Sequence, residues 1–203
     1  MIARLPPFAP GQTIGLLGGT FDPPHAGHRL ISAIALRRLR LDRLWWLVTP
    51  GNPLKATDGL AATRTRVEAA QRLARDPRIV VTGFEAEIGS RYTHETIAWL
   101  SRRSRGARFV WIMGADNLRQ FHRWRRWREI ADLAPIVVVD RPGSTLRALA
   151  GPAGAALARF RRPEAEAAWF VRFAPPVFLY LHGPRSGLSS TALRRAAVDP
   201  PSS

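Results

Sequence analysis

The chain has 203 residues, a formal net charge of +16 and no cysteine. Its length suits one domain with a full hydrophobic core, and the lack of cysteine excludes disulfides, thiolate metal sites and a cysteine nucleophile. Because the basic residues are spread along the chain and all but Lys55 are arginines, the charge favours solvated helix faces and attraction for anionic nucleotides over a dedicated nucleic-acid surface.

In chain order, residues 1–12 are proline-rich and lack the apolar core of a signal peptide. Short apolar runs then alternate with amphipathic stretches. The runs predict strands at residues 14–17, 43–49, 79–82, 109–113, 136–139 and 177–181. The amphipathic stretches predict helices over about 26–39, 62–74, 93–103, 124–133 and 189–197, with Thr93 as the N-cap of the third. Residues 145–173 permit a helix around 146–161, without clear boundaries.

Apolar strands that alternate with helices indicate an α/β fold: a Rossmann-like, doubly wound parallel sheet covered on both faces. We expect a single domain over residues 13–198, an N-terminal tail over 1–12 and a C-terminal tail over 199–203. No segment approaches the roughly 20 apolar residues of a membrane span. We therefore expect a cytoplasmic protein without membrane contact, as a monomer or a small homo-oligomer.

The stretch Thr13–Arg29 contains the most informative pattern. A predicted strand ends at Gly18-Gly19, and a loop leads to His25 and His28 at the start of the next helix. A glycine turn followed by a helix N-terminus binds phosphate, because free amide N–H groups and the helix dipole converge there. Two histidines three residues apart share one helix face, so both side chains can point at the same anion.

These residues resemble the signature of the nucleotidyltransferase superfamily with the T/HxGH motif, since Gly18 to His28 match G-G-T-F-D-P-x-H-x-G-H. The segment Leu188–Arg194, LSSTALR, resembles the second signature of that superfamily, I-S-S-T-x-[IL]-R. The resemblance implies the HUP-type nucleotidyltransferase architecture, with the ATP triphosphate between two helix N-termini. It implies ATP contacts by the following residues: Gly18, Gly19, Thr20, Phe21, His25, His28, Gly114, Asp116, Ser189, Ser190, Thr191 and Arg194.

The middle of the chain resembles the nicotinate-nucleotide adenylyltransferases. The similar segments are PGNPLK at 50–55, SRYTHETI at 90–97 and IMGADNLRQFHRWRRWREI at 112–130. The resemblance implies that nicotinate mononucleotide is bound by Asn52, Lys55, Tyr92, Thr93, Trp124 and Arg141. Amide N–H groups at a helix start suit the nicotinate carboxylate, and Trp124 would stack on the pyridine ring.

The family resemblance implies transfer of AMP from ATP to nicotinate mononucleotide, giving deamido-NAD and pyrophosphate in NAD biosynthesis. We expect direct in-line attack, with His25, His28, Lys55 and Arg194 as the catalytic residues and Mg²⁺ carried by ATP rather than by a protein metal site. Each residue also has an ordinary structural explanation, as a cap, a packing group or a surface charge.

Two alternatives remain at this point. One is another adenylyltransferase of the superfamily, with nicotinamide mononucleotide or pantetheine phosphate as acceptor. The other is a basic RNA-binding protein that uses the Arg-Trp run 123–128. The two phosphate signatures favour the enzyme, and no stable nucleic-acid partner is expected.

Overall fold

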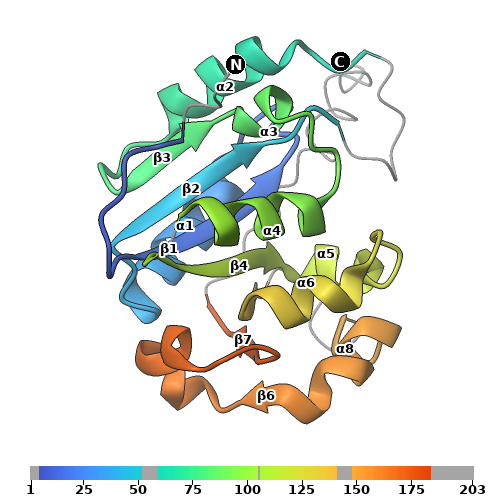
Figure 1. Ribbon diagram of the computed structural model, residues 1–203. Coiled ribbons are helices and arrows are strands. Elements are labelled where there is room, and N and C mark those ends of the chain that lie inside the picture. The colour runs from blue at the N-terminus through green and yellow to red at the C-terminus, as the bar shows by residue number, and fades with distance from the viewer. Residues whose placement is uncertain (1–4, 52–58, 105, 141–147, 184–203) are drawn as a thin grey trace, which may run out of the picture.

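The computed structural model describes residues 5–51, 59–104, 106–140 and 148–183 (Figure 1). Within these ranges one seven-stranded sheet has the order β3-β2-β1-β4-β5-β7-β6, and every pair of neighbours is parallel. The strands are β1 (Thr13–Gly19), β2 (Arg43–Val48), β3 (Ile79–Thr82), β4 (Arg108–Gly114), β5 (Ile136–Val139), β6 (Arg161–Arg162) and β7 (Phe178–Leu181). The six strands predicted from apolar runs are confirmed, and the two-residue β6 is an addition.

The α-helices are α1 (Ala26–Arg38), α2 (Thr63–Leu73), α3 (Phe84–Glu87), α4 (Thr93–Arg103), α5 (Ala115–Phe121), α6 (Trp127–Leu133) and α8 (Pro152–Leu157). Two 3₁₀ segments follow, η1 (Ala158–Phe160) and η2 (Glu164–Arg172). In Figure 1, α1 lies behind the sheet, whereas α4, α5 and α6 lie in front of it. The helices therefore cover both faces, as the doubly wound prediction requires.

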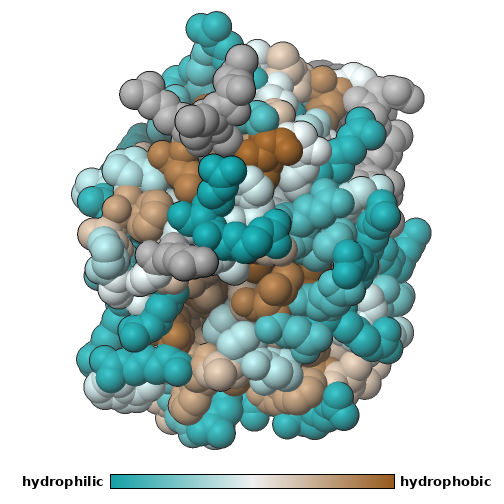
Figure 2. Space-filling model, in the orientation of Figure 1, coloured by the Kyte–Doolittle hydropathy of each residue, from teal (hydrophilic) through white to brown (hydrophobic). Residues whose placement is uncertain are grey.

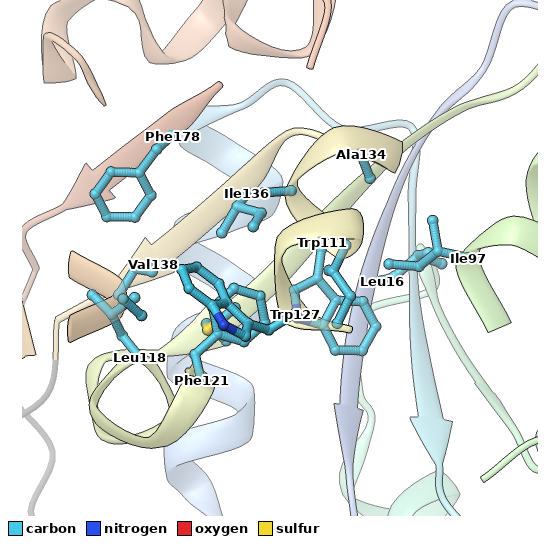
Figure 3. Close-up of a cluster of buried hydrophobic side chains, with 14 of the residues drawn as sticks. Leu16, Ile97, Trp111, Leu118, Phe121, Trp127, Ala134, Ile136, Val138 and Phe178 are labelled. Carbon is cyan, nitrogen blue, oxygen red and sulfur yellow. The ribbon is translucent and has the colours of Figure 1, made fainter. Parts of the chain in front are cut away.

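Alternation along each strand builds two hydrophobic cores. Leu16 and Trp45 belong to the core under α4, α5 and α6, while their neighbours Leu17 and Trp46 belong to the core under α1. Figure 3 shows the first core, in which Trp111 of β4 lies among side chains from the helices. Because both faces of each central strand are buried, the strands appear in the sequence as continuous apolar runs.

Two details of the predicted helices are wrong. The region predicted as one helix over 124–133 holds only α6, and α5 precedes it as a separate helix. Arg126 lies between α5 and α6 and directly precedes α6. Its φ of 53° places it in the left-handed region, which cannot continue a right-handed helix. The N-cap of α4 is Tyr92 rather than Thr93, since the Tyr92 carbonyl already accepts the N–H of Thr96 at 3.2 Å.

The described part of the predicted N-terminal tail, residues 5–12, lies against the domain. Leu5 and Phe8 pack on the core beneath α4, and the Gly11 N–H donates to the carbonyl of Gly106 at 2.7 Å. The C-terminal helix predicted at 189–197 falls outside the described residues. For residues 145–173 no clear helix boundaries were predicted. The described part of this segment, residues 148–173, contains α8, η1, β6 and η2.

Within the described ranges, none of the helices combines the length and the apolar character needed to cross a bilayer. Hydrophilic residues are spread over much of the face in Figure 2, with apolar patches between them.

The strand order reverses between β1 and β4. From β1 the chain winds outward through β2 and β3, and then returns to add β4 on the other side of β1. In open α/β sheets, ligands bind beyond the carboxyl ends of the strands at such a reversal. The carboxyl ends at this point are Gly18-Gly19 of β1 and Gly114 of β4.

Candidate active site

The two histidines of the signature together cap the start of α1. His25 is the N-cap residue, and its Nδ1 accepts the backbone N–H of Gly27 at 3.1 Å. His28, three residues on, accepts the backbone N–H of His25 on its own Nδ1 at 3.2 Å. The two rings lie with their centroids 4.0 Å apart. The sequence prediction that both side chains share the first turn and one helix face is confirmed.

These hydrogen bonds fix the tautomer of both rings. A ring nitrogen that accepts a backbone N–H is unprotonated, so in the neutral imidazole the proton is on Nε2. In the neutral form, His25 and His28 thus each carry the ring proton on Nε2. Both residues are more than nine-tenths buried, so their ring positions are set by packing as well as by the caps.

Buried aromatic side chains pack against the ring of His28. Phe21 stacks on Trp46 with centroids 5.1 Å apart and lies 4.5 Å from the His28 ring. The Trp46 indole N–H donates to Ser32 Oγ at 2.8 Å, and that hydroxyl donates to the carbonyl of His28 at 2.8 Å. The side chain of Phe21 is fully buried, so contact with ATP at this position would be through its backbone.

Gly18 lies against an aromatic ring of the neighbouring strand. A Cβ at Gly18 would come within 2.6 Å of the Trp111 indole, so no other residue fits without moving that ring. Trp111 in turn meets the edge of Trp124, with centroids 6.2 Å apart. Trp124 also packs on Phe121. This chain of contacts joins the predicted ATP loop to the residue predicted to stack on the pyridine ring.

The end of β4 carries the residues predicted to meet the adenosine ribose. Gly114 is buried and is the N-cap of α5, whereas Asp116 is exposed in the first turn of that helix. The two residues therefore lie at the carboxyl edge of the sheet, where β4 neighbours β1. A carboxylate there is a suitable acceptor for sugar hydroxyls.

The start of α4 is held by a buried polar network. Ser90 Oγ donates to the Tyr92 carbonyl at 3.2 Å and lies 3.0 Å from Thr96 Oγ1. Thr96 Oγ1 donates to the Glu85 carboxyl at 2.7 Å. Thr93 is the first helical residue, so its amide is one of the N–H groups at the helix N-terminus.

Glu85 is 5% exposed, and burial raises its pKa to about 7, while the hydrogen bond from Thr96 acts in the opposite direction. The sequence analysis missed this residue, because its burial depends on how α3 packs under α4.

A cavity of about 360 Å³ lies beside the start of α4. Its walls include Ser90, His94, Trp99 and Arg125, and Tyr92, Thr93 and Trp124 do not line it. Arg125 lies over the Tyr92 ring at 4.7 Å from its centroid. The cavity is therefore adjacent to the predicted nicotinate residues and separate from them.

Three of the four arginines in the Arg-Trp run contact their own chain. Besides Arg125, Arg126 pairs with Glu129 at 2.6 Å, and Arg128 lies over Trp127 at 4.5 Å. These contacts favour a structural role for the run over an RNA-binding surface.

The other predicted site residues lie outside the described ranges. They are Asn52, Lys55, Arg141, Ser189, Ser190, Thr191 and Arg194. Their roles remain predictions from the sequence.

The sequence analysis also missed Arg66. It lies on the inward side of α2 with Ala70, one turn later, and is 2% exposed. An arginine at a position that the helical repeat places on the buried face was the available signal.

Across the part of the chain that the structure describes, no group of three or more His, Asp or Glu side chains could hold a metal ion.

Comparisons with known proteins give a consistent result. The cytidylyltransferase-like family model matches residues 16–196. A probable nicotinate-nucleotide adenylyltransferase of Methylorubrum extorquens is 60% identical over 181 residues, covering 89% of this chain and 98% of the relative. Another from Agrobacterium fabrum is 54% identical over 183 residues, covering 90% and 98%.

Among solved structures, the nicotinic acid mononucleotide adenylyltransferase of Plasmodium falciparum in complex with NaAD superposes with a TM-score of 0.65. The match covers 91% of this chain and 83% of that one, at 14% identity. The same enzyme in complex with APC gives a TM-score of 0.64 at 13% identity. At this identity the similarity shows a shared fold.

Proposed function

Since the chain belongs to the nicotinate-nucleotide adenylyltransferases of the cytidylyltransferase-like family, we propose that it transfers AMP from ATP to nicotinate mononucleotide, forming deamido-NAD and pyrophosphate. The observation that carries this proposal is the pair of capping histidines at the point where the strand order reverses. Both relatives are named for this activity, and the alignment with this chain covers 98% of each of them.

The geometry suits direct attack by the mononucleotide phosphate on the α-phosphorus of ATP. The bond between the α-phosphorus and its bridging oxygen to the β-phosphate breaks, and pyrophosphate leaves. No protein nucleophile is needed, so catalysis consists of positioning and electrostatic stabilisation of charge on the phosphate oxygens.

His25 and His28 act through their Nε2–H groups, which donate hydrogen bonds to phosphate oxygens. Because each Nδ1 is occupied by a backbone N–H, the two rings act as neutral donors rather than as general bases. Lys55 and Arg194 are assigned as the residues that bring full positive charge to the phosphates. This assignment rests on the sequence signatures.

The acceptor is assigned to the side of the site where α4 and Trp124 lie. The amide groups at the start of α4 suit the nicotinate carboxylate, and Trp124 suits the ring. Asn52 and Arg141 are assigned to the acceptor phosphate. Gly114 and Asp116 would contact the ribose of ATP, and Ser189, Ser190 and Thr191 its phosphates.

Mg²⁺ is assigned to the triphosphate, where it would neutralise charge and keep several of its waters. We place the enzyme in the cytoplasm, where its nucleotide substrates occur.

Turnover with different acceptors tests this function. Pyrophosphate release from ATP is measured with nicotinate mononucleotide, nicotinamide mononucleotide and pantetheine phosphate at matched concentrations. We expect fastest release with the acid nucleotide. Preference for either other acceptor would select the other adenylyltransferase, and salt-sensitive RNA binding without release would select the nucleic-acid alternative.

A further inference from the structure

Arg66 of α2 lies between three separate segments of the chain. It is 2% exposed, and every hydrogen bond recorded for its side chain goes to a neutral oxygen. The acceptors are the carbonyls of Ala61 at 2.7 Å, Thr20 at 2.7 Å, Thr49 at 2.8 Å and Pro50 at 3.4 Å, and Oγ1 of Thr63 at 3.0 Å.

The chemistry of this arrangement is unusual for a buried arginine. Burial lowers the pKa of the guanidinium, and the charge of Asp22 raises it in part, but an arginine keeps its proton in proteins. Its planar fork offers N–H donors in fixed directions, which match several acceptors at once. A lysine carries the same charge on one nitrogen and cannot reach the same set of oxygens.

The acceptors belong to the segments that the activity needs. Thr20 lies in the signature between Gly19 and His25. Thr49 and Pro50 directly follow β2 and precede Asn52 and Lys55 in the chain. A side chain that binds both segments fixes the end of β1 relative to the end of β2. Arg66 therefore determines the separation between the histidine loop and the strand end that leads to Lys55.

The contact with Thr20 also sets a peptide orientation. In a trans peptide the C=O and the following N–H point in opposite directions. With the Thr20 carbonyl turned toward Arg66, the N–H of Phe21 is directed away from it. Phe21 has a φ of 49°, in the left-handed region that a non-glycine residue adopts only when its surroundings impose it.

We propose that Arg66 is a positioning residue for adenylyl transfer: it holds the phosphate-binding loop and the end of β2 in one fixed geometry. The inference rests on the proposed function of the same site. Only Arg66 and Ala70 are buried on α2. The proposal gives this helix a role in catalysis, because Arg66 holds the two loops in place.

The test compares Arg66→Lys and Arg66→Met with the control Arg64→Lys. Arg64 is on the same helix, its side chain is 91% exposed, and it pairs only with Glu68 in the recorded contacts. Each variant is assayed at a temperature where its circular dichroism shows it folded, with kcat and both KM values measured separately. Thermal shifts on addition of ATP give a readout that needs no turnover.

We expect Arg66→Lys to fold, to lose about 10- to 100-fold in kcat and to keep both KM values within about threefold, because misplacement of reacting groups costs rate more than binding. Arg64→Lys should match the wild type. Methylguanidinium added to folded Arg66→Met should restore part of kcat.

Wild-type kcat in folded Arg66→Lys would overturn the inference. Failure of both Arg66 variants to fold would also overturn it, because Arg66 would then be needed for folding and not for positioning. A wild-type protein that releases no pyrophosphate would instead overturn the proposed function. In that case a lost ATP thermal shift in folded Arg66→Lys would overturn the positioning role, and a shift close to that of the wild type, as expected when binding is nearly unchanged, would retain it.

Discussion

The Nδ1 atom of His28 accepts the backbone N–H of His25 at 3.2 Å, so the second histidine of the signature closes the cap begun by the first. In the proposed function, one side chain therefore serves the helix through Nδ1 and would bind phosphate through Nε2–H. The two functions can be separated experimentally, because a glutamine at this position of a helix can still accept the N-cap amide.

Replacing His28 tests this separation. His28→Ala loses the cap and the donor, and we expect kcat to fall by about 10²- to 10³-fold, as for other single donors to a developing charge. The KM for nicotinate mononucleotide should change little. His28→Gln should keep the melting temperature close to that of the wild type and still lose most of kcat. Wild-type turnover in His28→Ala would refute the assignment.

The support beneath His28 predicts a stability effect. Ser32→Ala leaves the buried Trp46 N–H without its acceptor, which should lower the free energy of unfolding by about 1–3 kcal/mol. Urea unfolding measures the loss. In a Trp46→Phe background, where the donor is already absent, the same substitution should cost less; equal costs would show that the hydrogen bond contributes nothing.

Glu85 predicts a pH dependence of stability. Burial raises its pKa from 4.5 to about 7 in the folded protein, so between these values the folded state binds the proton more tightly than the unfolded state. The resulting stabilisation is fully present below 4.5, declines by up to about 1.4 kcal/mol per pH unit and is lost above about 7.

Glu85→Gln cannot ionise and keeps an acceptor for Thr96. The difference in free energy of unfolding between Glu85→Gln and the wild type should therefore shift in favour of Glu85→Gln as the pH rises from 4.5 to about 7. Above about 7 the difference should stay constant. Urea titrations at several pH values give the comparison. Parallel curves for the two proteins would contradict the burial argument.

Trp124 predicts a selective effect on the acceptor. Trp124→Ala should raise the KM for nicotinate mononucleotide by about 5- to 150-fold, the equivalent of 1–3 kcal/mol of stacking, with a smaller change for ATP. Trp169→Ala is a matched control, because Trp169 is 50% exposed and contacts Arg40 and Arg172. An equal rise in both KM values would show that Trp124 acts through packing on Trp111 instead.

Direct attack predicts the absence of an exchange reaction. Without acceptor, the enzyme should not exchange labelled pyrophosphate into ATP, because no adenylyl-enzyme forms. Addition of deamido-NAD should permit the exchange through the reverse reaction. Exchange with ATP alone would indicate a covalent intermediate and a protein nucleophile.

The features predicted from the sequence are those that local patterns determine. The strand ending at Gly19 and the two histidines on the first turn of α1 lie within one short stretch, so spacing alone brings them together. Continuous apolar runs likewise predict strands buried on both faces. The parallel sheet follows from the alternation of the two.

The features missed depend on contacts between distant segments. Arg66 has acceptors 46 and 17 residues away, at Thr20 and Thr49, and no local pattern identifies them. Gly18 was predicted as part of a phosphate-binding glycine turn, yet the Trp111 ring of β4 also requires a glycine there. The N-cap of α4 is a local exception: it is Tyr92 rather than Thr93, because the Thr96 N–H donates to the Tyr92 carbonyl.

The central claim is tested most directly by identifying the dinucleotide that the enzyme makes. The purified protein is given ATP, Mg²⁺ and equal amounts of nicotinate and nicotinamide mononucleotide, and anion-exchange chromatography separates the products by the extra carboxylate of deamido-NAD. We predict that deamido-NAD is the main product and appears in step with pyrophosphate. A mixture dominated by NAD, or one without any dinucleotide, would contradict the account.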